Sequence, residues 1–120
     1  MATILVVEDT PANRALATKL LRVAGHEVLT AETAAAGIAL AREAVPDLVL
    51  MDLGLPDMDG WHAINELRAD PGAARLRVIA FTAHAMVGDR ERALANGFDG
   101  YLSKPIDFAT FADSVAGYLP

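Results

Sequence analysis

The sequence predicts an α/β fold in which helices cover both faces of a parallel five-stranded sheet. Short apolar runs alternate with longer segments of helical periodicity along the whole chain. The apolar runs lie at residues 4–7, 27–31, 48–51, 78–81 and 101–102. Strands that alternate with helices indicate repeated βα units, which build parallel sheets.

The composition of the five runs predicts their order in the sheet. The first, third and fourth runs are apolar at every residue, as expected for central strands that are buried on both faces. The second run contains Glu27 and Thr30, and Ser103 follows the fifth, so these two suit the edges. With right-handed crossovers the order becomes 2-1-3-4-5, which is a flavodoxin-like (βα)5 three-layer sandwich.

Capping residues indicate where the helices between these strands begin and end. Thr10 precedes Pro11, and Asp59, Asp89 and Asp107 each stand ahead of a helical stretch. Asn96-Gly97 indicates a helix end. Apolar residues recur at helical spacing in three segments, namely Leu16, Leu20 and Val23; Trp61, Ile64 and Leu67; and Phe108, Phe111, Ala112, Val115 and Leu119.

Length and composition limit the possible functions. A chain of 120 residues forms one domain, so we expect a single domain over residues 1–120. The absence of cysteine excludes disulfides and thiolate metal sites, and a net charge of −6 disfavours binding to nucleic acid or anionic lipid. Because no leader or long apolar stretch is evident, we expect a cytoplasmic protein without a membrane contact.

Five polar residues follow or end the predicted strands. They are Glu8, Asp9, Asp52, Thr82 and Lys104. Ligands bind such sheets beyond the carboxyl ends of the strands, at the point where the strand order reverses. We therefore expect these side chains to converge on one acidic pocket suited to a divalent cation and a phosphoryl group.

Three carboxylates in this pocket repel one another, so one or more pKa values should be raised. A magnesium ion (Mg²⁺) removes that cost and uses one or two carboxylates together with phosphate oxygens. Asp52 is then the candidate nucleophile, because a carboxylate beside a cation can form an aspartyl phosphate. An EF-hand calcium loop is disfavoured, since Leu55 occupies its first ligand position and a strand precedes it.

The stretches around these residues resemble the receiver domains of bacterial two-component response regulators. They are VVED at 6–9, LMDLGLPDMDG at 50–60, FTA at 81–83 and YLSKP at 101–105. The resemblance extends over essentially the whole chain. It implies a single-domain regulator that takes a phosphoryl group from a histidine kinase or histidine phosphotransfer protein and signals to a downstream protein target. Such a protein catalyses its own phosphorylation and dephosphorylation and is not a turnover enzyme.

The resemblance also assigns individual roles. Asp52 becomes the phosphoacceptor, and Asp9 and Asp52 become direct Mg²⁺ ligands. The Gly54 carbonyl completes the direct ligands, and Glu8 binds through water. Thr82 and Lys104 become the partners of the phosphoryl group, with Thr82 and Tyr101 forming the switch. A cis peptide bond is implied between Lys104 and Pro105.

Three positions depart from the usual family pattern. Thr10 stands where asparagine or aspartate is common, and we expect its helix cap to survive. Gly54 and His84 occupy positions that flank the attacking water in the family. Glycine offers only backbone there, and we interpret His84 as a partly exposed loop residue. The phosphate lifetime is therefore left open.

The sequence disfavours three alternative functions and leaves a fourth open. An aspartyl-phosphate hydrolase needs a second acid two residues after its nucleophile, where this chain has Gly54. A flavin or nucleotide carrier needs a phosphate-binding loop after the first strand, which Glu8 and Asp9 would repel. A degenerate receiver lacks an acid, the threonine or the lysine, whereas all are present here. A receiver segment of a hybrid histidine kinase or longer regulator stays open.

The predicted signal passes from the phosphate to the neighbouring strand. We expect Thr82 to move toward the phosphoryl group, its loop over 83–89 to follow, and Tyr101 to turn into the vacated space. The surface formed by the fourth helix, fifth strand and fifth helix would then change, and a partner protein could bind there.

Overall fold

A computed structural model describes residues 2–83 and 88–119. Five parallel strands form one sheet, in the order β2-β1-β3-β4-β5 that the sequence predicted. The strands are β1 (Thr3–Val7), β2 (Glu27–Ala31), β3 (Leu48–Asp52), β4 (Val78–Thr82) and β5 (Gly100–Ser103). The helices are α1 (Pro11–Val23), α2 (Ala34–Ala44), α3 (Gly60–Ala69), α4 (Asp89–Ala95) and α5 (Phe111–Ala116). This is the predicted flavodoxin-like (βα)5 sandwich.

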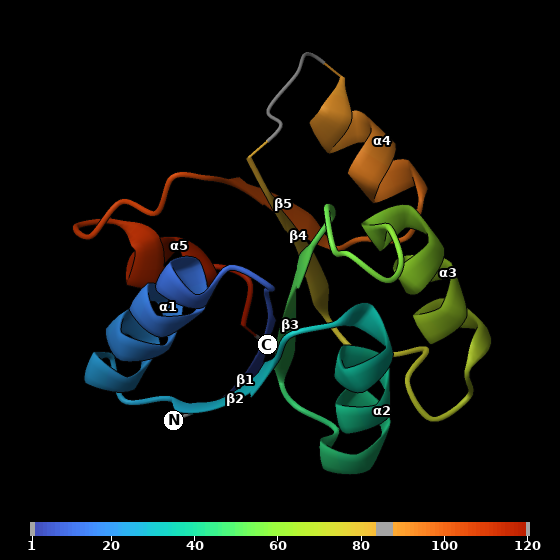
Figure 1. Ribbon diagram of the computed structural model, residues 1–120, viewed down its shortest axis with the longest axis horizontal. Helices are drawn as coiled ribbons and strands as arrows, with labels where there is room; N and C mark the ends of the chain where they lie inside the picture. The colour runs from blue at the N-terminus through green and yellow to red at the C-terminus, as the bar shows by residue number, and fades with distance from the viewer. Residues whose placement is uncertain (1, 84–87, 120) are drawn as a thin grey trace.

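The helices form two outer layers, with α1 and α5 on one face of the sheet and α2, α3 and α4 on the other (Figure 1). Alternate residues of the central strands point to opposite faces, so each face has its own apolar cluster. Ile4 and Val6 pack toward α1 and α5, whereas Leu5 and Val7 pack toward α2 and α3. The core therefore lies on both sides of β1, β3 and β4, which are buried at nearly every residue.

The predicted stripe on α1 is wrong in part. Ala17 and Leu21 are the buried residues of this helix, Leu20 packs at the side, and Val23 is 79% exposed. A small alanine lets the helix approach the sheet closely, whereas Val23 is the last residue of the helix. Hydrophobicity alone placed the stripe one residue away from the face that the helix buries.

The beginning of α5 also differs from the prediction. The Asp107 carboxylate accepts a hydrogen bond from the Ala109 amide at 2.9 Å, and its carbonyl accepts one from Phe111. This turn delays the helix to Phe111, so Phe108 lies before it and is 71% exposed. Phe111 and Val115 are the residues that this helix buries.

The predicted caps have mixed outcomes. The Asp59 carboxylate accepts a hydrogen bond from the His62 amide at 2.8 Å and caps α3, as expected. Thr10 takes the N-cap position of α1 and Pro11 follows as its first residue, as predicted, but the Thr10 side chain makes no capping hydrogen bond. Asp89 is the first residue of α4 rather than its cap, because Gly88 with φ 91° takes the cap position.

Candidate functional site

The carboxyl ends of four neighbouring strands bring the predicted residues together. Glu8 and Asp9 follow β1, Asp52 and Thr82 end β3 and β4, and Lys104 follows β5. In the parallel register Val7 pairs with Met51 and Asp52 pairs with Phe81, so these strands end at one level. The predicted convergence is confirmed.

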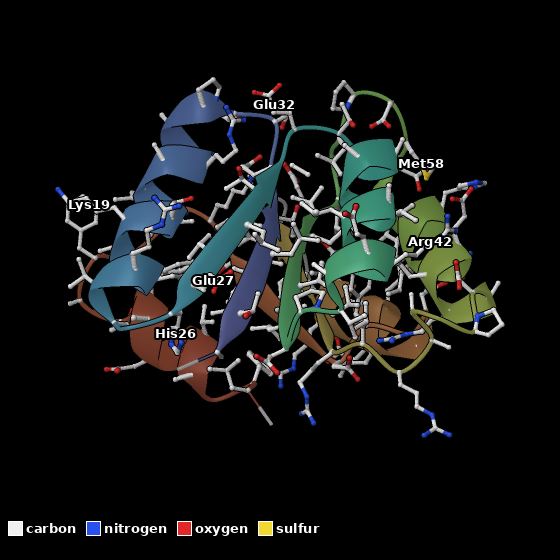
Figure 2. All side chains as sticks on the ribbon, turned by 90° about the horizontal axis from the view of Figure 1, so that it is seen from below. Lys19, His26, Glu27, Glu32, Arg42 and Met58 are labelled. Carbon is white, nitrogen blue, oxygen red and sulfur yellow. The ribbon has the colours of Figure 1, made fainter. Side chains whose placement is uncertain are left out.

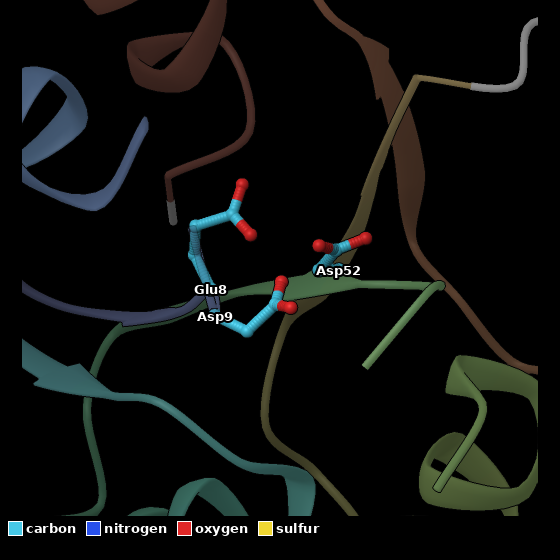
Figure 3. Close-up of side chains that lie close together, drawn as sticks. All are labelled: Glu8, Asp9 and Asp52. Carbon is cyan, nitrogen blue, oxygen red and sulfur yellow. The ribbon is translucent and has the colours of Figure 1, made fainter. Parts of the chain in front are cut away.

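Three carboxylates lie at the centre of this site. One oxygen from each of Glu8, Asp9 and Asp52 lies within 4.8 Å of the other two, and Figure 3 shows the three groups gathered between β1 and β3. Glu8 is fully buried, Asp52 is 6% exposed, and Asp9 is half-buried. Solvent therefore screens the repulsion among them only partly.

Lys104 supplies the opposing charge. Its ammonium group forms an ion pair with Glu8 Oε1 and donates a hydrogen bond to Asp52 Oδ2 at 3.1 Å. The Gly54 amide donates to Asp52 Oδ1 at 2.9 Å, so both oxygens of Asp52 are held. The Lys104 ammonium also lies 5.0 Å from the centre of the Phe81 ring. Lys104 thus contacts two of the three acids, and among these four residues the acids outnumber the lysine.

The pKa values of the two buried acids, Glu8 and Asp52, shift in opposite directions. Burial raises the pKa of Glu8 to about 7, with Asp52 adding to the effect and Lys104 opposing it. Burial also acts to raise the pKa of Asp52, but the neighbouring Glu8 carboxyl, the Gly54 amide and Lys104 together lower it. Asp52 is therefore ionised near neutral pH, as a nucleophile must be, and the predicted raised pKa belongs to Glu8.

The donor set fits a hard divalent cation. All three side chains offer carboxylate oxygens, which Mg²⁺ and Ca²⁺ prefer. Glu8 Oε1 is buried, and its contact with Lys104 is ionic without the geometry of a hydrogen bond. A cation would compensate this buried charge and the excess of acids over lysine.

Arg14 supports the acidic loop, and the sequence analysis did not identify it. Its guanidinium donates to the Glu8 carbonyl at 3.0 Å and the Asp9 carbonyl at 3.4 Å, and pairs with Glu32 at 3.0 Å. These partners are mainly backbone carbonyls from another element, which carry no side-chain signal. The only available sign was an arginine five residues beyond a pair of acids.

The predicted switch residues lie on adjacent strands. Thr82 is 1% exposed, and its carbonyl accepts a hydrogen bond from the Lys104 amide at 2.8 Å. Tyr101 pairs with Ala80 and packs at the edge of the cluster beneath α2, α3 and α4. Burial raises the pKa of Tyr101, and the negative charge of Asp89 adds to it.

Two further expectations concern the neighbouring loops. The peptide bond between Lys104 and Pro105 is cis, as the resemblance implied. His84 and most of the loop over 83–89 lie outside the described residues. Across the part of the chain that the structure describes, no helix has both the length and the apolarity needed to cross a membrane.

Comparison with known proteins identifies the family. The family model for the response regulator receiver domain matches residues 4–116. The polar-differentiation response regulator DivK of Brucella ovis is 37% identical over 117 residues, covering 98% of this chain and 95% of that protein. DivK of Brucella anthropi matches with the same identity and coverage.

Solved structures agree with this match. The chemotaxis response regulator CheY4 of Vibrio cholerae superimposes with a TM-score of 0.91 at 26% identity, covering 99% of both chains. The receiver domain of the sensor histidine kinase PA1611 of Pseudomonas aeruginosa, solved with a magnesium ion in its active-site cleft, gives 0.86 at 35% identity, covering 98% of this chain and 96% of that one. Sequence, fold and the acidic site agree, and the chain belongs to the response regulator receiver domain family.

Proposed function

We propose that Asp52 is the phosphoacceptor of this receiver and that residues 1–120 form one receiver domain. An ionised oxygen of Asp52 forms a bond to the phosphorus of a phosphohistidine, while the bond from phosphorus to the imidazole nitrogen breaks and the nitrogen keeps the electron pair. The position of Asp52 carries this proposal: its two oxygens accept hydrogen bonds from the Lys104 ammonium at 3.1 Å and the Gly54 amide at 2.9 Å, beside Glu8 and Asp9. Against the effect of burial, the contacts with Glu8, Gly54 and Lys104 lower the pKa of Asp52.

The surrounding residues hold the reactants and their charge. Lys104 already contacts Asp52 Oδ2 and would pair with a phosphoryl oxygen, and the Thr82 hydroxyl would donate a hydrogen bond to another. Asp9, Asp52 and the Gly54 carbonyl would hold Mg²⁺, with Glu8 acting through water. When bound, Mg²⁺ would neutralise negative charge on the carboxylates and the phosphoryl group.

The proposed partners are proteins. A histidine kinase or histidine phosphotransfer protein donates the phosphoryl group, and a downstream protein receives the signal. We propose a cytoplasmic protein that is not a turnover enzyme. Gly54, two residues after Asp52, is exposed and has no side chain to protonate a leaving group, which argues against an aspartyl-phosphate hydrolase.

We further propose that Thr82 and Tyr101 transmit the phosphorylated state. Tyr101 is partly buried against the cluster beneath α4, and Thr82 ends the adjacent strand. Movement of Thr82 toward the phosphoryl group would free space for the tyrosine ring. NMR or crystal structures with and without beryllofluoride test this, because an unchanged position and exposure of the Tyr101 ring would exclude the switch.

The phosphoacceptor is tested by mass measurement. Wild type, Asp52→Asn and Asp59→Asn are incubated with Mg²⁺ and acetyl phosphate, and intact masses are recorded over time. Wild type and Asp59→Asn should gain one base-labile phosphoryl group, whereas Asp52→Asn should gain none. Asp59 is a suitable control because it lies in the loop that follows Asp52 and caps α3. An equal yield on Asp52→Asn would remove Asp52 from the proposed role.

A further inference from the structure

The N-terminus of α2 is capped by a residue from a distant loop. Asp57 lies between β3 and α3, and its two carboxylate oxygens accept hydrogen bonds from the Ala34 amide at 2.9 Å and the Ala35 amide at 3.0 Å. In Figure 2, Met58 of this loop and Glu32 of the β2–α2 loop lie at the end of the molecule toward which β2 points. Asp57 thus joins two loops at the carboxyl ends of the strands.

The first turn of α2 depends on this contact. It contains no acidic residue, so its free amides and the positive end of the helix dipole need an acceptor from elsewhere. Thr33 Oγ1 accepts from the Ala36 amide at 3.1 Å, and Asp57 takes the two amides that remain. The Ala35 and Ala34 amides lower the pKa of Asp57, so its carboxylate is ionised at neutral pH.

The loop that contains Asp57 also forms part of the candidate site. The Gly54 amide donates to Asp52 Oδ1 at 2.9 Å, and the Gly54 carbonyl is one of the proposed Mg²⁺ ligands. The base of the loop is closed by a hydrogen bond of 3.0 Å from the Gly60 amide to the Leu53 carbonyl. A Cβ at Gly60 would lie 2.7 Å from Leu53 Cα, so the close approach requires glycine there. Asp57 adds a tether on the far side of Gly54.

The beginning of α2 is itself fixed relative to the other acidic loop. The Glu8 amide donates to the Ala31 carbonyl at 3.0 Å, and Arg14 joins the Glu8 carbonyl to the Glu32 carboxylate. The segment from Ala31 to Ala35 therefore contacts both loops that carry proposed ligands. This segment therefore fixes the two loops relative to each other. Among the described residues, α2 itself contributes no side chain to the acidic cluster.

We propose that Asp57 is a positioning residue for cation binding. By binding the N-terminus of α2, it holds the loop with the Gly54 carbonyl in register with Asp9 and Asp52. This inference rests on the proposed Mg²⁺ role of the same site. It assigns to Asp57 a contribution to cation affinity without contact with the cation.

Mg²⁺ alone serves as the probe. Asp57→Ala should weaken Mg²⁺ binding by about threefold to tenfold, near the lower limit for residues that orient metal ligands. Asp57→Asn keeps one acceptor oxygen and should give a smaller loss. Amide NMR titrations measure the affinities, and in the wild type the Ala34 and Ala35 amide signals should shift as Mg²⁺ saturates the site.

Thr33→Ala is the matched control. It removes a capping hydrogen bond from the same end of α2 but leaves the contact with the β3–α3 loop. Its Mg²⁺ affinity should stay within about twofold of wild type, while its urea midpoint without Mg²⁺ falls as for any lost N-cap.

The outcomes separate the two proposals. If Asp57→Ala and Thr33→Ala weaken Mg²⁺ binding equally, Asp57 only stabilises α2, and the inference is overturned. It is also overturned if Asp57→Asn, or both Asp57 variants, bind as wild type does. If wild type itself binds no Mg²⁺, the cation role under the proposed function fails, and the inference fails with it.

Discussion

Charged side chains at the two ends of the sheet are partnered in opposite ways. At the carboxyl ends of the strands, Glu8, Asp9 and Asp52 lie together, and Lys104 contacts Glu8 and Asp52. Burial and Asp52 raise the pKa of Glu8 to about 7. At the amino ends, Arg68 of α3 directs its guanidinium to backbone carbonyls and a single carboxylate. The first arrangement leaves excess charge for a ligand, whereas the second satisfies the chain's own groups.

The arrangement around Arg68 joins three segments. Its guanidinium donates to the Gly97 carbonyl at 2.7 and 2.9 Å, to the Ala74 and Leu76 carbonyls, and to Asp99. The Asp99 carboxylate also accepts from the amide that begins β4 at 2.8 Å. Polar groups at this end therefore hold α3, the following loop and the end of α4 together. We infer that one end of the sheet serves binding and the other serves stability.

Lys104→Met should produce the largest effect on the chemistry. It removes the ammonium that faces Asp52 and the proposed phosphoryl oxygens, so the rate of acetyl phosphate labelling should fall about 100-fold or more. Intact mass against time measures this rate at saturating Mg²⁺. Arg68→Met makes the comparable change at the other end of the sheet and should label within about twofold of wild type. Equal losses in both variants would contradict the division between the two ends.

Arg68→Met should produce the largest loss of stability. The backbone carbonyls that it leaves behind, together with Asp99, lose a half-buried charged donor, so the free energy of unfolding should fall by about 2 to 3 kcal/mol. Urea unfolding followed by the fluorescence of Trp61 measures this. A variant that unfolds as wild type does would show that water replaces the guanidinium without cost.

Cation affinity should depend on pH through Glu8. The folded pKa of about 7 lies above the usual glutamate value of 4.5, which applies to an unfolded chain. Protonated Glu8 therefore stabilises the cation-free fold below about pH 4.5, and this contribution is lost as the pH rises through 7. Because the proton and Mg²⁺ compete, Mg²⁺ affinity should rise about tenfold from pH 6 to pH 8.

Glu8→Gln is the control for this titration. It keeps the shape of the side chain but cannot ionise, so the rise in Mg²⁺ affinity between pH 6 and pH 8 should largely disappear. Calorimetric titration with Mg²⁺ at several pH values measures both proteins. A pH dependence that persists in Glu8→Gln would assign the titration to another group.

The sequence was sufficient for the residues that converge through strand order. Runs that are apolar at every residue identified β1, β3 and β4 as central, and parallel strands bring their carboxyl ends together. Glu8, Asp52 and Lys104 could therefore be placed in one site from the sequence alone. The alternation of strands and helices determines directly which residues meet at this end of the molecule.

The sequence was insufficient where a side chain binds the backbone of another segment, whether near or far along the chain. Arg14 binds carbonyls of the acidic loop, Asp57 binds amides 22 and 23 residues away, and Arg68 binds a carbonyl 29 residues away. Backbone groups are the same at every position, so no pattern of residue types marks such partners. The predicted place of Phe108 on the last helix was wrong for a related reason, because the turn made by Asp107 competes with the helix.

Val45→Asn should produce the smallest effect. It relieves an unfavourable backbone conformation at the end of the sheet that we assign to stability. Val45 ends α2 with φ 45° and ψ 63°, a left-handed conformation that a β-branched side chain disfavours. It is 59% exposed, so little packing is lost, and asparagine should raise the free energy of unfolding by about 1 kcal/mol. Val23→Asn is the control, because that valine is also exposed but has no positive φ. A similar gain in both variants, measured in urea, would mean that removing an exposed valine, and not relief of the backbone at Val45, stabilises the chain.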